Sequence, residues 1–159
     1  MNQLNIRRYG DGEIKLVAIH GLGSASTAWD LVQPELQKHF EFITLDLPGH
    51  GEAVMRADES MNPVNISKLI LRELQAIGIT KFHLIGNSLG GWIALEMAAA
   101  FPENVLSVTG VAPAGLWLKP KTHRNGELAV SRYLAKLTYR FAHPISKFKF
   151  LRAIGFKLV

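Results

Sequence analysis

Cysteine is absent from the 159 residues of the sequence. A disulfide framework, a thiolate metal site and a cysteine nucleophile are therefore excluded. Long apolar runs are also missing, because the longest apolar-leaning stretch, residues 105–118, is interrupted by polar residues, a proline and two glycines. It is too short and too broken to span a bilayer. The basic pair Arg7 and Arg8 is not followed by the apolar segment of a secretory signal. We expect a soluble, cytoplasmic protein.

Acidic residues are scarce toward the C-terminal end. Residues 1–115 contain 8 Lys/Arg and 12 Asp/Glu, a net charge of −4, whereas residues 116–159 contain 10 Lys/Arg and a single acid, Glu127. Such a basic segment is typical of contact with nucleic acid, an anionic membrane or a phosphorylated carrier. It is also expected where the segment belongs to a larger domain whose other parts carry the balancing acids. We favour this second interpretation, and no nucleic-acid partner is predicted.

The apolar residues are arranged in an alternation of strands and helices. With 48% apolar and 19% charged residues, the chain can bury the core of one domain. Continuous apolar runs favour strands that are covered on both faces, as in a parallel sheet. Their alternation with helical patterns predicts an α/β fold built from right-handed βαβ units. The expected strands are 16–19, 42–45, 82–85 and 105–111, and the expected helices are 29–40 (interrupted by Pro34), 62–77 and 89–101.

The junction after the third strand carries the strongest chemical signal. Residues 86–91 read Gly-Asn-Ser-Leu-Gly-Gly, which fits the pattern Gly-x-Ser-x-Gly between a strand and a helix. A turn this tight leaves no room for side chains at Gly86 and Gly90, two positions before and after the serine. It predicts a strained Ser88 whose hydroxyl projects above the sheet, at the positive end of the following helix.

Two other strand-to-helix junctions are rich in glycine. Residues 19–24 read Ile-His-Gly-Leu-Gly-Ser, and such a loop can direct backbone N–H groups at the oxygen that becomes charged in a tetrahedral intermediate. Residues 46–51 read Asp-Leu-Pro-Gly-His-Gly, which are turn-forming residues, so a structural role is the favoured interpretation. His50 in this second loop is interpreted as a rim residue rather than a base.

These three junctions, in this order, resemble the N-terminal half of the α/β-hydrolase fold family over about residues 4–118. The resemblance implies a parallel-sheet hydrolase core in which Ser88 is the nucleophile and the N–H groups of Leu22 and Leu89 form the oxyanion hole. It implies no metal and no organic cofactor. A serine at this position disfavours the branches of the family whose nucleophile is a carboxylate. The elbow and loop glycines that match the family motifs are Gly21, Gly23, Gly86 and Gly90.

The chain departs from the family pattern after Ser88, where the family places an acid and then a histidine. No aspartate follows Ser88, and residues 112–115, where some members carry the acid, read Ala-Pro-Ala-Gly. Glu96 and Glu103 are expected to point away from the serine, because they lie within or just after the helix that it begins. We therefore expect a truncated hydrolase, with residues 1–115 as part of the core and residues 116–159 as the start of a helical lid.

No histidine of the chain is assigned as the catalytic base. His20 belongs to the proposed oxyanion loop and His83 to a strand expected to be buried. His123 and His143 fall in the region that matches the family's lid, where surface or lid histidines are the favoured interpretation. Since a serine without a positioned base is a weak nucleophile, the chain alone is expected to turn over activated esters negligibly.

The first function hypothesis is a serine hydrolase acting on a small ester, thioester or related acyl compound. The alternative is a catalytically inactive fragment or a ligand-binding pseudoenzyme. A third reading is a membrane- or carrier-associated module that uses the basic tail, where residues 147–159 have the spacing of an amphipathic helix with a cationic face. We favour a lid for this segment. The sequence leaves the oligomeric state open.

Overall fold

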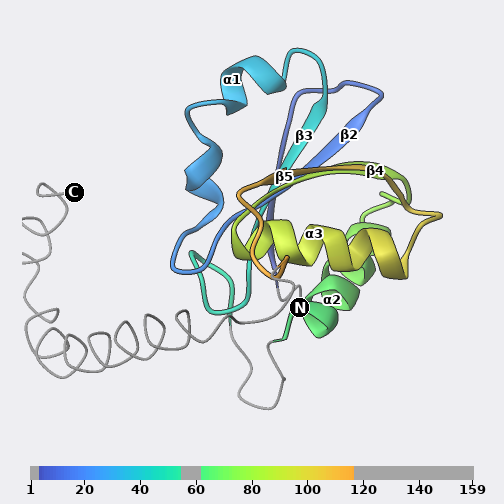
Figure 1. Ribbon diagram of the computed structural model, residues 1–159. Helices are drawn as coiled ribbons and strands as arrows, with labels where there is room; N and C mark the ends of the chain where they lie inside the picture. The colour runs from blue at the N-terminus through green and yellow to red at the C-terminus, as the bar shows by residue number, and fades with distance from the viewer. Residues whose placement is uncertain (1–3, 55–61, 117–159) are drawn as a thin grey trace, which may run out of the picture. The chain divides into compact units, whose positions relative to one another are not determined.

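The computed structural model describes residues 4–54 and 62–116 of the chain (Figure 1). The expected lid, the amphipathic segment 147–159 and the histidines at 123 and 143 lie outside the described residues. In the described part, the strands form a sheet with the order β1-β3-β2-β4-β5. The strands are β1 (Asn5–Tyr9), β2 (Lys15–Ile19), β3 (Glu41–Asp46), β4 (Phe82–Asn87) and β5 (Val105–Val111). The helices are η1 (Ser26–Trp29), α1 (Gln33–Leu36), α2 (Pro63–Ala76) and α3 (Leu89–Ala100).

The sheet is mostly parallel, as the sequence predicts. Strand β2 pairs in parallel with β3 and with β4, and β4 pairs in parallel with β5. In this register Ile19, near the end of β2, lies beside Leu45 of β3 and Gly86 of β4. The carboxyl ends of the three central strands therefore meet at one edge of the sheet, which is where ligands bind in open α/β folds.

Strand β1 is not predicted by the sequence and makes the sheet mixed. It pairs antiparallel with β3, so that Ile6 lies opposite Leu45. Its sequence, Asn-Ile-Arg-Arg-Tyr, lacks an apolar run because the strand lies at an edge and is only partly buried. Arg8 is nevertheless paired with the buried carboxylate of Glu41 on β3. This ion pair adds to the packing of Ile6 and Tyr9 against the core clusters.

Helix α2 begins and ends where its residues predict. The Asn62 side chain accepts a hydrogen bond from the Asn65 amide at 2.8 Å, and Pro63 occupies the first turn. Gly78 follows the helix with a φ of +82°, in the left-handed region that suits glycine. The apolar residues between these ends place Ile70 and Leu74 in the core without exposure.

Removing the N-cap of α2 is expected to lower the free energy of unfolding by about 1 kcal/mol, because Asn62→Ala leaves the Asn65 amide without its cap. Urea unfolding followed by circular dichroism measures this change. The exposed Lys68 of the same helix supplies the control, since Lys68→Ala should change stability by less than about 0.5 kcal/mol. Equal losses in the two variants would contradict the assignment of the cap.

Pro34 divides the region that the periodicity predicts as one helix. The chain forms the 3₁₀ turn η1 over Ser26–Trp29 and then α1 over Gln33–Leu36, with Pro34 in the first turn of α1. Proline cannot donate a backbone hydrogen bond, so a continuous helix through this position is disfavoured. Trp29 at the end of η1 is buried against Leu16, Ala18 and Phe42 of the sheet.

The larger core cluster lies between the sheet and the helices α2 and α3, which pack against each other. Along β4, Phe82, Leu84 and Gly86 are buried, whereas the alternate residues His83, Ile85 and Asn87 are half-buried. The expectation that this strand is covered on both faces, and that His83 is buried, is therefore wrong for the described part of the chain. The helices α2 and α3 cover one face of β4, and no described helix fully covers the other.

Within the described residues, no helix combines the length and the apolar content that a bilayer crossing requires.

Candidate active site

Ser88 lies in the turn between β4 and α3, with an unusual backbone conformation. Its φ is +51° and its ψ is −110°, a region that non-glycine residues rarely occupy. The conformation is held by backbone hydrogen bonds: the Ser88 amide donates to Val111 at 3.0 Å, and the Ser88 carbonyl accepts from Trp92 and Ala114 at 3.1 and 2.9 Å. The side chain is exposed. The predicted strained turn is therefore confirmed.

Steric contacts explain the glycines that flank the serine. A Cβ atom at Gly86 would lie 2.5 Å from the carbonyl carbon of Gly90, so the two glycines face each other across the turn as expected. A Cβ atom at Gly90 would instead meet the end of β2, at 2.6 Å from the His20 oxygen and from the Ile19 carbonyl carbon. Gly90 therefore allows α3 to pack directly on β2. This second contact is one that the Gly-x-Ser-x-Gly pattern does not reveal.

The loop after β2 lies next to the serine. A Cβ atom at Gly21 would be 3.4 Å from the Ser88 Cβ. Gly23 has a φ of +74°, and the Ser24 amide closes the turn by donating to the Gly21 oxygen at 3.2 Å. Leu22 at the tip is 76% exposed.

The amides expected to form the oxyanion hole are those of Leu22 and Leu89. In the described part of the chain, neither the Leu22 N–H nor the Leu89 N–H has a hydrogen-bond partner. Leu89 is the first residue of α3, where the helix dipole gives the backbone N–H groups a partial positive charge. An amide at the start of a helix can donate a hydrogen bond to an anionic group. The catalytic role of the Leu22 and Leu89 amides stays a prediction.

His20 is fully buried below the loop and is held from both ring nitrogens. Its Nδ1 donates to the Gly21 oxygen at 2.7 Å, and its Nε2 accepts from the Leu47 amide at 3.0 Å. Burial lowers the pKa of His20 and the nearby His50 ring lowers it further, against opposing effects of the Gly21 carbonyl and Asp46. Both ring nitrogens of His20 are thus used in hydrogen bonds that connect the loop to the start of the turn after β3. This structural role agrees with the prediction that His20 is not the catalytic base.

His50 makes contacts that the sequence analysis missed. Its Nε2 accepts a hydrogen bond from the Gly23 amide at 3.1 Å, and its Nδ1 lies 3.0 Å from the Pro48 oxygen. Its ring centroid is 5.2 Å from that of His20. The prediction of a rim residue is therefore incomplete, because the half-buried ring connects the turn after β3 to the loop beside Ser88. The only sequence signal was the presence of a histidine among turn-forming residues.

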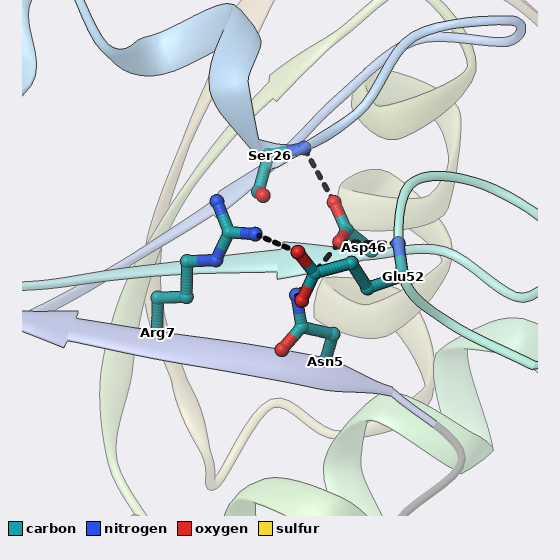
Figure 2. A network of polar contacts seen from close by, with 5 residues as sticks. All are labelled: Asn5, Arg7, Ser26, Asp46 and Glu52. Atoms are coloured by element: carbon teal, nitrogen blue, oxygen red, sulfur yellow. Dashed lines mark hydrogen bonds and ion pairs between the residues drawn. The ribbon is translucent and has the colours of Figure 1, made fainter.

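Asp46 at the end of β3 organises this region, and Figure 2 shows its carboxylate between three neighbouring segments. The carboxylate is buried and accepts hydrogen bonds from the Ser26 amide at 2.6 Å, the Asn5 side chain at 2.9 Å and the Glu52 amide at 3.0 Å. Arg7 closes the network through an ion pair with Glu52 at 3.3 Å. These bonds support the structural interpretation of the turn.

The hydrogen bonds also determine the charge of Asp46. Burial raises the pKa of the carboxyl, but the bonds from Asn5, Ser26 and Glu52 outweigh this effect and lower the pKa from 3.8 to about 2. The carboxylate therefore remains charged at neutral pH. Gly51 is required beside it, since a Cβ atom there would lie 2.6 Å from the Asp46 Oδ1.

No described imidazole or carboxylate is hydrogen-bonded to the Ser88 hydroxyl. Glu96 lies two turns into α3 and accepts from the Trp92 indole at 2.9 Å, and Glu103 is exposed beyond the end of that helix. The His83 Nδ1 is 2.7 Å from the Ser107 hydroxyl. Within the described residues, the site thus contains the expected serine and amides without a partner for proton transfer.

A cavity of about 210 Å³ opens beside the turn. It is lined by Ala28, Trp29, Asn87 and Val111, from η1 and from the ends of β4 and β5. One of these residues, Asn87, directly precedes the serine in the sequence.

Comparison with known proteins identifies relatives of the chain. A dihydrolipoyllysine-residue acetyltransferase component of the acetoin cleaving system from Pseudomonas putida is 38% identical over 110 residues, which are 67% of this chain and 29% of that protein. A pimeloyl-[acyl-carrier protein] methyl ester esterase from Hamiltonella defensa subsp. Acyrthosiphon pisum (strain 5AT) is 29% identical over 154 residues, or 95% of this chain and 57% of that protein. The chain thus spans less than two thirds of the length of both relatives.

A solved structure and a family model show which fold family the chain is similar to. The crystal structure of a membrane phospholipase A, described as a bacterial virulence factor, superposes with a TM-score of 0.70 and 31% identity, covering 74% of this chain and 38% of that chain. The model of the alpha/beta hydrolase fold matches residues 15–158. The chain therefore belongs to the α/β-hydrolase fold family, and its homologues include esterases and lipases.

Proposed function

We propose that the chain provides the nucleophile and the oxyanion hole of a serine hydrolase that acts on a small ester, thioester or related acyl compound. The observation that carries the proposal is the conformation of Ser88, whose strained turn exposes the hydroxyl at the start of α3. Backbone strain of this kind is costly and is maintained at functional sites. The amides of Leu22 and Leu89, which have no partner among the described residues, would supply hydrogen bonds to the negatively charged oxygen.

In the proposed reaction, the Ser88 Oγ attacks the carbonyl carbon and its proton passes to a base. The carbonyl oxygen becomes negatively charged and accepts hydrogen bonds from the Leu22 and Leu89 amides. The alcohol or thiol leaves with a proton, and water then hydrolyses the acyl-serine. No described histidine is hydrogen-bonded to the Ser88 hydroxyl. The ring nitrogens of His20 and His50 are engaged elsewhere, and the His83 Nδ1 lies at the Ser107 hydroxyl. The proposal assigns the acid and the histidine of the complete site to no residue of this chain.

Two of the proteins that are similar to this chain support the proposed substrate class by their names. The relatives include a methyl ester esterase, and a solved structure of a phospholipase A shares the fold at 31% identity. Both names describe cleavage of carboxylic esters, which a serine nucleophile with an oxyanion hole can perform. In this proposal, the cavity lined by Trp29, Asn87 and Val111 contacts part of such a substrate. A cytoplasmic location remains part of the proposal.

A second candidate function is a ligand-binding pseudoenzyme. One observation favours it, namely that the Ser88 hydroxyl has no described base. In that case the cavity and the amides would bind an acyl compound or a carboxylate without turnover. The two candidate functions predict different reactivities of Ser88: a nucleophile reacts selectively with an acylating or phosphonylating reagent, whereas the serine of a binding protein does not.

Reaction with a fluorophosphonate probe tests the proposal, with the modified residue identified by peptide mass spectrometry. Ser88 is expected to react selectively but about 10³-fold or more slowly than in an intact serine hydrolase, because the proposed oxyanion hole favours the reaction while no described residue supplies a base. Ser88→Ala should abolish the labelling. Hydrolysis of activated esters by the same chain should stay close to the uncatalysed rate.

Ser107 provides an internal control for this experiment. It is exposed and is hydrogen-bonded to His83 at 2.7 Å, but it lies in a strand without free helical amides. Preferential modification of Ser107, or equal modification of both serines, would contradict the role of Ser88. Labelling of Ser88 at the rate of an intact hydrolase would instead show that this chain contains a base, and His123 or His143 would then be the candidate.

A further inference from the structure

The loop that carries Leu22 makes few contacts within itself and is held by hydrogen bonds to other segments. Leu22 is 76% exposed, and a Cβ atom at Gly23 would find no other atom within 4 Å. Between His20 and Ala25, the one backbone hydrogen bond within the described loop joins the Ser24 amide to the Gly21 oxygen. A glycine-containing loop with so few contacts has a large conformational freedom of its own. Its observed shape therefore depends on bonds to other segments.

Those bonds all come from the end of β3 and the turn that follows it. The Ser26 amide donates to Asp46 at 2.6 Å, at the far end of the loop. At the near end, the His20 Nε2 accepts from the Leu47 amide at 3.0 Å. In the middle, the Gly23 amide donates to His50 at 3.1 Å. The bond to His50 is the one nearest to Leu22.

The partners of His50 determine the form of its ring. The Pro48 oxygen, 3.0 Å from Nδ1, can only accept a hydrogen bond, so Nδ1 carries the proton. The Gly23 amide can only donate, so Nε2 must present its lone pair. Both contacts are satisfied by the neutral ring protonated at Nδ1 and by no other form. The ring is therefore an acceptor for the loop, which is incompatible with proton transfer at Ser88.

The bond at Gly23 determines the orientation of the neighbouring peptide groups. The peptide between Leu22 and Gly23 is planar, so fixing the Gly23 N–H fixes the plane on the carboxyl side of Leu22. On the other side, the Leu22 N–H lies in the same peptide plane as the Gly21 carbonyl, which accepts hydrogen bonds from the His20 Nδ1 at 2.7 Å and from the Ser24 amide at 3.2 Å. Leu22 thus lies between two peptide groups that are both held by hydrogen bonds, and the bond to His50 holds the one on its carboxyl side.

We infer that His50 is a positioning residue of the proposed active site: its Nε2 holds the Gly23 amide and thereby keeps the Leu22 N–H directed at the oxygen that develops charge beside Ser88. This inference rests on the proposed function. It assigns a histidine that sequence reasoning interpreted as a rim residue to the support of the oxyanion hole. Hydrogen-bond donors stabilise a transition state most when they already point at the atom that becomes charged. A more mobile loop should therefore slow the reaction of Ser88.

Paired substitutions of His50 test the inference. His50→Phe keeps a ring but removes the acceptor, and it should slow fluorophosphonate labelling of Ser88 about 10-fold or more. Hydrogen exchange of the Gly23 amide, followed by ¹⁵N NMR, should accelerate in the same variant. His50→Gln places an amide oxygen near the Nε2 position and should retain most of the labelling rate. His39→Phe, at an exposed histidine of the same chain, is the matched control and should change neither measurement.

The outcomes separate the inference from the proposed function. Unchanged labelling and Gly23 exchange in His50→Phe, with Ser88 still modified, would overturn the role of His50 and leave the proposed function intact. If Ser88 of the wild-type chain is not modified, the proposed function falls, and the inference falls with it. If His50→Phe does not fold, His50→Asn replaces it, since an asparagine amide is too short to reach Gly23. Equal labelling rates in His50→Asn and His50→Gln would then overturn the inference.

Discussion

Gly90→Ala is expected to lower the free energy of unfolding by about 3 kcal/mol, a large effect for a single added methyl group. The new Cβ would lie 2.6 Å from the His20 oxygen and from the Ile19 carbonyl carbon, and neither backbone atom can move without breaking the end of β2. Helix α3 must then separate from the sheet. Urea unfolding followed by tryptophan fluorescence measures the loss, with the m-value as a check that the transition stays cooperative.

Gly78→Ala is the matched control, because it adds the same methyl group in a different setting. Gly78 has a φ of +82° and no atom within 4 Å of its Cβ position. The substitution there costs only the strain of a left-handed alanine, about 1 kcal/mol. A smaller or equal loss at Gly90 would contradict the direct packing of α3 on β2.

Asp46→Ala is expected to destabilise the protein by about 3 kcal/mol. The substitution removes the acceptor of three hydrogen bonds and leaves the buried amide of Ser26 without a partner. Bonds to a charged group and the cost of an unsatisfied buried donor are each worth roughly 1–3 kcal/mol. The same urea experiment measures the change. A loss below about 1 kcal/mol would show that water replaces the carboxylate and that the network of Figure 2 contributes little to stability.

The charge of Asp46 also makes this contribution dependent on pH. The folded-state pKa is about 2, below the ordinary value of 3.8, so the carboxylate stabilises the fold fully above about pH 4. The contribution, about 2 kcal/mol, is lost as the pH falls through 2. Asp46→Asn cannot titrate, and the difference in stability between this variant and the wild type should shrink as the pH is lowered. A constant difference would contradict the depressed pKa.

The strand-to-helix turn at Ser88 could be predicted from the sequence because its cause is local. Two glycines, a serine between them, and the change from a β-rich run to a helical pattern all lie within a few residues. The cap at Asn62 and the split at Pro34 are local in the same sense, and the structure confirms both. In each case the decisive interaction joins residues that are close in the sequence, so the residue types alone carry the signal.

Strand β1 and the contacts of His50 could not be predicted, because both depend on interactions between residues that are far apart in the sequence. The bond between Gly23 and His50 joins positions 27 residues apart, and the bond from Asn5 to Asp46 joins positions 41 apart. No pattern within either segment indicates the other. The half-buried face of β4 was not predicted either. A continuous apolar run predicts that both faces of a strand are buried, but it does not indicate which segment covers each face, and no described helix fully covers this one.

The conformation of Ser88 does not depend on its own side chain. The turn is held by backbone hydrogen bonds to Val111, Trp92 and Ala114, and by the absence of side chains at the glycines around it. During evolution, the side chain at position 88 can therefore change while the backbone of the turn stays the same. A lineage could exchange the serine for another small side chain, lose the reaction and keep the same fold with its cavity. Descent from a catalyst to a binding protein would then need one substitution and leave the backbone at this turn unaltered.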